Sequence, residues 1–123
     1  MKLVIPGTLP GLNEYTKANR TSKYVAAKFK REAEGLIGYY ANVAKRKSAP
    51  VIAPVTLHYT WYEPNKKRDK DNIAFARKFI QDALVSAGIL ENDGWAQIEG
   101  FSDSFEVDKA NPRVEVVIEA VKG

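Results

Sequence analysis

One predicted strand constrains the fold of this chain more than any other feature: residues 55–62, with the sequence VTLHYTWY. It is rich in the β-branched and aromatic residues that favour strands, and Pro64 follows where a strand would end. Its odd-numbered positions are the more apolar ones, so one face of the strand should be buried. Such a strand needs paired neighbours and a layer packed on its apolar face.

The rest of the chain supplies further strands and two long helices. Short strands are predicted at residues 2–5, 96–101 and 113–119, with a hairpin connection over 105–111. The Gly- and Pro-rich stretch from Gly7 to Arg20 is interpreted as a loop. We therefore expect an α+β fold: one small domain spanning residues 1–123, with a mixed sheet of about four or five strands and two main helices packed on it.

The helices are predicted from their caps and their apolar spacing. Ser22 is a plausible N-cap for a helix to about Arg46, and Gly88 follows a second helix that runs from about Asp69–Asp71 to Ala87. The expected buried face of the first helix is Val25, Phe29, Leu36, Tyr40 and Val43. The expected buried face of the second is Ile73, Ala76, Ile80, Ala83, Leu84 and Ala87.

Composition narrows the chemistry. The chain has no cysteine and one histidine, which excludes disulfides and a multi-histidine metal site, so a bound metal would take oxygen ligands, as Mg²⁺ or Mn²⁺ does. No signal peptide and no apolar run long enough to cross a membrane is visible, so we expect a cytoplasmic protein without a membrane partner. Residues 1–50 hold ten Lys and Arg against three Asp and Glu, which favours a polyanion as partner.

The segment Lys66-Lys67-Arg68-Asp69-Lys70-Asp71-Asn72 carries the strongest chemical signal. Two carboxylates lie two residues apart among basic residues, and Asp93 follows beyond the second helix. Carboxylates that hold a divalent metal beside bases that hold phosphates suit an enzyme acting on phosphodiesters. The alternative is an acidic helix N-cap in a solvated basic turn. Whether the Asn92-Asp93 turn returns to Asp71 is left open by the sequence.

The strings Arg68-Asp69-Lys70-Asp71-Asn72, Lys78-Phe79-Ile80-Gln81-Asp82-Ala83-Leu84 and Asn92-Asp93 resemble the RusA-like Holliday-junction resolvases. These are small, dimeric, magnesium-dependent endonucleases common in prophages. The resemblance implies that Asp69, Asp71 and Asp93 are metal ligands and that Lys78 is the essential lysine. In the short form of the motif the lysine stands four residues after the second aspartate, where this chain has Phe75. Lys78 stands three residues further on, which in a continuous helix is a rotation of about 300° and a rise of about 4.5 Å, so Arg77 is a second candidate for this role.

The expected function is therefore magnesium-dependent resolution of four-way DNA junctions by a homodimer in recombination and repair, without a small-molecule cofactor. We expect the dimer interface to use the aromatic residues Tyr59, Trp61, Tyr62, Phe75 and Trp95. Two alternatives remain: a non-catalytic basic DNA-binding protein, and a magnesium-dependent nucleotide hydrolase, although no G-x-x-x-x-G-K phosphate loop is present. The residues expected to bind DNA are Asn13, Lys17, Arg20, Lys28, Lys30, Arg31, Lys66, Lys67, Arg68, Lys70 and Arg77.

Overall fold

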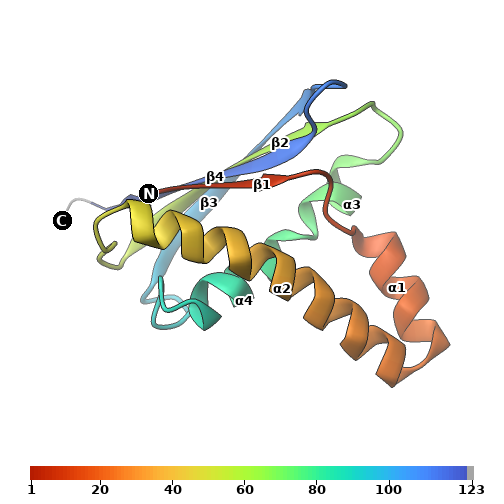
Figure 1. The fold of residues 1–123 in the computed structure, drawn as a ribbon, viewed down its shortest axis with the longest axis horizontal. Helices are drawn as coiled ribbons and strands as arrows, with labels where there is room; N and C mark the ends of the chain where they lie inside the picture. The colour runs from red at the N-terminus through yellow and green to blue at the C-terminus, as the bar shows by residue number, and fades with distance from the viewer. Residues whose placement is uncertain (122–123) are drawn as a thin grey trace.

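A four-stranded sheet in the order β1-β4-β2-β3 forms one layer of the molecule, and helices cover one of its faces (Figure 1). The computed structural model describes residues 1–121. The strands are β1 (Lys2–Pro6), β2 (Val55–Glu63), β3 (Ile98–Val107) and β4 (Arg113–Ala120). The helices are α1 (Leu12–Thr21), α2 (Lys23–Lys47), α3 (Lys70–Ala74) and α4 (Arg77–Ser86). The predicted α+β class with a mixed sheet is confirmed. No helix among the described residues is long and apolar enough to cross a membrane.

The strand β2 is buried at every second position, as its sequence predicts. Its odd-numbered side chains pack with those of β1 and β4 against α2 and α4, and Tyr59 and Trp61 are each 1% exposed. These two rings stack 5.5 Å apart inside the core. The expectation that Tyr59 and Trp61 are exposed at a dimer interface is therefore wrong, because both belong to the apolar face of the strand.

The prediction that a hairpin connects β3 and β4 is wrong. β2 lies between these two strands, pairing antiparallel with β4 and parallel with β3. A parallel pair needs a long crossover, and α3 and α4 provide it between β2 and β3. This arrangement places the end of β2 beside the end of β3, where Glu63 pairs with Val107.

The segment after β1 contains a helix where a loop was expected. Its Gly and Pro residues all lie between Pro6 and Gly11, and no breaker occurs within α1. Gly11 is the N-cap residue, and its N–H donates to the Glu14 carboxylate at 3.0 Å. The breakers therefore end β1 and start the helix rather than excluding one.

The helix α2 begins as predicted, with the Ser22 hydroxyl accepting the Val25 N–H at 3.0 Å. Its buried face is one residue away from the predicted one, because the helix packs closely through small side chains. Val25 and Leu36 are exposed, whereas Phe29 and Tyr40 lie at the margin of the core. The buried residues of α2 are Ala26, Ala33, Ile37, Ala41 and Ala44.

The second predicted helix is interrupted at Phe75–Ala76, which separates α3 from α4. The interruption is a tight turn in which Ala76 N–H donates to Ile73 C=O and Lys78 N–H to Phe75 C=O. The predicted apolar stripe is nevertheless buried from Ile73 to Leu84, and Ala87 at its end is partly buried. Gly88 has the positive φ of 73° expected after the C-terminus of α4. Its N–H bonds to Val85 and that of Ile89 to Leu84, which is a Schellman motif.

Candidate active site

A pocket of about 580 Å³ opens where β2 and β3 end and α3 begins. The parallel pairing of the two strands creates this site, because it sets the end of β2 beside the last residues of β3, and the segment that follows β2 lines the same pocket. The lining includes the two carboxylates of the D-x-D string, basic side chains and one aromatic ring. Its residues are Glu63, Asn65, Lys66, Arg68, Asp69, Lys70, Asp71, Ile73, Phe105, Glu106 and Val107.

Both aspartates of the string are exposed at this pocket. Asp69 is the N-cap residue of α3, yet its side chain accepts no capping hydrogen bond. The alternative in which this carboxylate serves only as an N-cap is therefore not supported by the contacts. Asp71 accepts the N–H of Asn72 with Oδ1 at 2.9 Å. These two residues could contribute carboxylate oxygens to one divalent cation.

Asp93 does not line the pocket that contains Asp69 and Asp71. It lines a second pocket, of about 290 Å³, together with Gln81, Trp95 and Phe101. Across residues 1–121, no group of three or more His, Cys, Asp or Glu side chains is placed to hold a metal ion. The crossover explains this separation: the D-x-D string lies at its beginning, after the end of β2, and Asp93 lies at its end, before the start of β3.

An ion pair between Asp103 of β3 and Arg77 of α4 lies between the two pockets. Asp103 is positioned between Phe105, which lines the first pocket, and Phe101, which lines the second. Its carboxylate accepts from the Trp61 indole at 2.9 Å and forms an ion pair with Arg77. Arg77 also lies over the Phe101 ring, 4.5 Å from its centre. The guanidinium of Arg77 is thus fixed within the protein.

The structure does not bring Lys78 into the D-x-D pocket. Lys78 is exposed on α4 and forms an ion pair with Asp82 at 3.2 Å. The position inferred for Lys78 relative to the D-x-D string assumed a continuous helix, and the turn at Phe75–Ala76 removes that basis. Asp82 also approaches Lys30 of α2 at 3.7 Å, and Lys30 in turn approaches Glu34 at 3.9 Å.

Glu34 belongs to the same cluster and has a raised pKa. Partial burial raises its pKa above the ordinary value of a glutamate; Lys30 opposes the shift, and the nearby charge of Asp82 adds to it. One oxygen of Glu34 and one of Asp82 are buried without a hydrogen-bond partner. Lys30, predicted to bind DNA, therefore lies beside two carboxylates.

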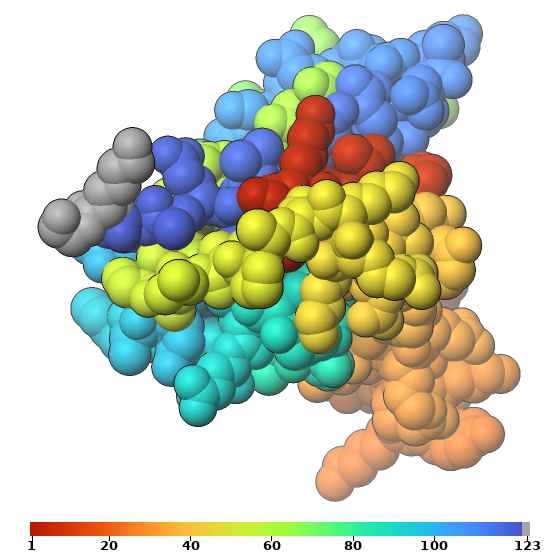
Figure 2. Space-filling model, turned by 60° about the vertical axis from the view of Figure 1, so that its left-hand side comes forward, coloured from red at the N-terminus to blue at the C-terminus, as the bar shows by residue number. Residues whose placement is uncertain are grey.

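Other predicted DNA-binding residues are exposed, and three of them lie along one helix. Asn13, Lys17 and Arg20 follow at spacings of four and three, which places them on one face of α1. Their line starts at α3, because the Asn13 N–H donates to the Asn72 side chain at 2.9 Å. The turn between α1 and α2 projects as a separate lobe, opposite the lobe formed by the ends of β3 and β4 (Figure 2). Also exposed are Lys28, Arg31, Lys66, Lys67 and Lys70.

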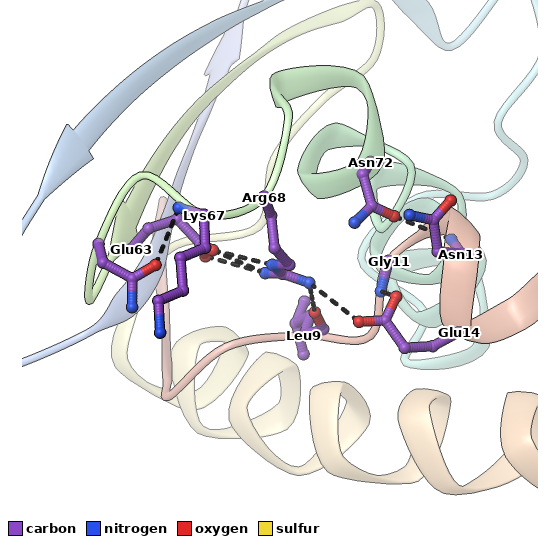
Figure 3. Close-up of polar contacts among 9 residues, drawn as sticks. Leu9, Gly11, Asn13, Glu14, Glu63, Lys67, Arg68 and Asn72 are labelled. Atoms are coloured by element: carbon purple, nitrogen blue, oxygen red, sulfur yellow. Dashed lines mark hydrogen bonds and ion pairs between the residues drawn. The ribbon is translucent and has the colours of Figure 1, made fainter.

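Arg68 differs from these residues, because its donors are already used within the protein. It makes two hydrogen bonds of 3.0 Å to the carboxylate of Glu63 and a third, also 3.0 Å, to the carbonyl of Leu9 (Figure 3). Sequence reasoning missed Glu63, which is 7% exposed. Its odd-numbered position at the end of β2 is the only signal that could have indicated burial.

Sequence reasoning also missed Phe105, Glu106 and Asn72. Phe105 and Glu106 reach the pocket through the parallel pairing of β3 with β2, for which the sequence carries no local signal. Lys70 lies over the Phe105 ring at 5.6 Å from its centre. Asn72 is buried, and as the last residue of the D-x-D-N string it could have been singled out.

Of the other aromatics expected at a dimer interface, one is fully available. Trp95 is 100% exposed in the turn before β3. Tyr62 is covered by the Arg113 guanidinium, 3.7 Å from its ring centre. Phe75 packs against Tyr15 and Phe79, with ring centres 5.5 and 5.6 Å apart.

Comparison with known protein families finds one family model that matches most of the chain. The family model described as Endodeoxyribonuclease RusA matches residues 6–119, which takes in all elements from α1 to β3, the last residue of β1 and all of β4 except its last residue. A search of curated proteins found no match. The span of the family match establishes that the chain belongs to the endodeoxyribonuclease RusA family.

Proposed function

We propose that this protein is a magnesium-dependent endonuclease that resolves Holliday junctions by paired, symmetric nicks. The observation that carries the proposal is the pair of exposed carboxylates, Asp69 and Asp71, in a pocket that Lys66 and Lys70 also line. The match of residues 6–119 to the RusA endodeoxyribonuclease family supports the choice of DNA as substrate.

The donor set of the pocket fits a magnesium ion. Mg²⁺ retains several of its waters and is commonly bound through one or two carboxylates together with substrate phosphates. Asp69 and Asp71 can supply those carboxylates, since Asp69 makes no capping bond and Asp71 uses one oxygen for the Asn72 N–H. When bound, the ion supplies Lewis acidity that activates water and stabilises the leaving oxygen at phosphorus. Mn²⁺ satisfies the same ligands.

The remaining residues have roles in holding DNA. Lys66 and Lys70 can neutralise phosphates next to the scissile bond, and the exposed face of α1 with Lys17 and Arg20 can follow the backbone away from it. Asp93 and Lys78 belong to the proposal through their positions in the family motif. The variants Asp93→Asn and Lys78→Met test them: loss of cleavage with retained binding supports their roles, and normal cleavage removes them from the site.

The decisive experiment uses a labelled four-way junction with and without Mg²⁺. We expect cleavage by the wild type only with the metal, and no cleavage by Asp71→Asn, with junction binding retained because a negative charge near the phosphates is gone. Glu91→Gln, which removes an exposed carboxylate outside both pockets, is the matched control and should cleave normally.

Cleavage by Asp71→Asn at the wild-type rate would disprove the site. Binding without any cleavage by the wild type would favour a non-catalytic DNA-binding protein, and hydrolysis of free nucleotides in preference to the junction would favour a nucleotide hydrolase.

The proposal includes a homodimer. A four-way junction is close to two-fold symmetric, and one chain offers one D-x-D pair, so two chains related by a two-fold axis would present two sites. Light scattering should give the mass of a dimer. Mixing wild-type and Asp71→Asn chains should then yield singly nicked junctions. A monomer that makes paired cuts on one junction would contradict this part of the proposal.

A further inference from the structure

The two residues that bracket the Asp69-Lys70-Asp71 turn both bind the same distant segment. Arg68 bonds to Leu9, and Asn72 bonds to Asn13, each across 59 residues of sequence. Figure 3 shows both side chains directed toward the segment 9–14, which leads into α1. The three residues between them line the pocket, as Arg68 itself does, whereas Asn72 is buried and does not line it. The D-x-D turn is thus held at each end.

The first contact is made by Arg68, which forms a hydrogen-bonded ion pair with Glu63. Arg68 donates through Nε and Nη2 to the two carboxylate oxygens of Glu63, and its Nη1 donates to the Leu9 carbonyl. The same Nη1 lies 3.8 Å from the Glu14 carboxylate. The Glu63 side chain is 9% exposed, so the guanidinium neutralises a nearly buried charge. A guanidinium with this geometry ties the end of β2, the segment before α1 and the D-x-D turn together.

The second contact replaces a missing cap. Gly11, the N-cap residue of α1, has no side chain to accept an N–H from the first turn. Asn72 supplies that acceptor, because its Oδ1 takes the Asn13 N–H at 2.9 Å. The close approach requires Gly11: a Cβ there would lie 2.5 Å from Asn72 Oδ1 and 2.6 Å from the Asn72 carbonyl oxygen. The backbone N–H of Asn72 also orients the Asp71 carboxylate.

We propose that Arg68 and Asn72 are positioning residues that fix the separation and orientation of the Asp69 and Asp71 carboxylates. Two like charges on an exposed turn repel each other, so the turn must be held from outside if both are to meet one cation. The same two contacts align α1, and with it Lys17 and Arg20, with the metal-binding turn. Arg68 is consequently a support of the site rather than a contact to DNA phosphate. The inference rests on the proposed metal-binding role of Asp69 and Asp71.

The test measures metal binding and DNA binding separately in Arg68→Gln and Asn72→Leu. Binding of Mn²⁺ to the DNA-free protein is measured by calorimetry, and junction affinity is measured without divalent metal. We expect metal affinity to fall about 10- to 100-fold in each variant, the range found when groups supporting metal ligands are removed. Junction affinity should change far less. Asn72→Asp should keep a metal affinity closer to the wild-type value than Asn72→Leu does, because the aspartate carboxylate can accept the same Asn13 N–H.

Lys67→Gln is the matched control, since Lys67 is exposed in the segment just before Arg68 and its backbone N–H bonds to Asn65. It should lower junction affinity and leave metal affinity unchanged. If Arg68→Gln does not fold because it leaves the Glu63 charge unpaired, the double variant Glu63→Gln with Arg68→Gln removes both charges and takes its place.

The outcomes separate the two proposals. A wild type that binds Mn²⁺ while Arg68→Gln and Asn72→Leu bind it equally well overturns the positioning role and leaves the proposed function intact. Loss of junction affinity with unchanged metal affinity in Arg68→Gln also overturns it, because that result assigns Arg68 to phosphate. A wild type that binds no divalent metal and does not need one to cleave overturns the proposed function itself.

Discussion

The substitution Gly11→Ala provides the sharpest test of how the D-x-D turn is held. Gly11 has an extended backbone with φ of −99° and ψ of −174°, which alanine adopts without strain. The cost of the substitution therefore comes from the new Cβ alone. That atom would lie 2.6 Å from a backbone oxygen of Asn72, which cannot turn aside as a flexible side chain could.

The magnitude follows from two effects. Forcing an extra carbon into a tight contact costs about 1–3 kcal/mol. Displacing Asn72 also weakens its hydrogen bond to Asn13, which contributes about 0.5–1.5 kcal/mol. The lower entropy of the unfolded alanine chain offsets about 0.4–1 kcal/mol of this. We therefore expect a net loss of roughly 2–3 kcal/mol. With an unfolding entropy of about 2.1 cal/mol/K per residue over 123 residues, Tm should fall by about 8–12 °C.

Thermal unfolding followed by circular dichroism measures this shift, and Gly35→Ala is the control. Gly35 lies within α2, and a Cβ there would meet no atom within 4 Å. The same substitution should therefore stabilise the protein by about 0.5–1 kcal/mol at that position. A Tm for Gly11→Ala equal to or above that of the wild type would refute the argument that Asn72 is packed against Gly11.

Three further predictions concern charge and exposure. Reversing Lys28 and Arg31 to Glu should weaken junction binding and reduce the slope of log affinity against log salt by about 0.9 for each lost phosphate contact; an unchanged slope would exclude α2 from DNA binding. The raised pKa of Glu34 means that its stabilising contribution is present below the unfolded pKa and is lost as pH rises through the folded pKa. As pH rises from below the unfolded pKa of Glu34 to above its folded pKa, the Tm of Glu34→Gln should therefore fall less than the Tm of the wild type. An identical fall in the two proteins would contradict a raised pKa for Glu34. Trp95 is fully exposed whereas Trp61 is 1% exposed, so Trp95→Phe should remove most of the fluorescence that acrylamide quenches. Quenching that survives this substitution would contradict the placement of Trp95.

Much of the local structure could be predicted from residues close together in the chain. The burial pattern of β2 follows from its alternation, Ser22 caps α2, and Gly88 ends α4 in the left-handed conformation. The buried stripe of α3 and α4 was also identified from spacing. Each of these features depends on interactions within about one helical turn or on the two faces of one strand.

The errors arose where neighbouring elements decide the outcome. The buried face of α2 follows its alanines rather than its largest apolar residues, because close packing against the rest of the core favours small side chains there. The helix α1 was missed because breakers that belong to its start were taken as typical of the whole segment.

The sequence by itself identified Asp69 and Asp71 as the centre of the candidate site, since two carboxylates at this spacing among lysines carry a chemical signal without any fold. Only the tertiary structure decided what surrounds them. Parallel pairing of β2 with β3 brings Phe105 and Glu106 to the pocket, and the segment 9–14 reaches Arg68 and Asn72 from far away in the chain. The same pairing keeps Asp93 in a separate pocket, because a crossover between parallel strands must carry the chain back along the sheet before the next strand begins.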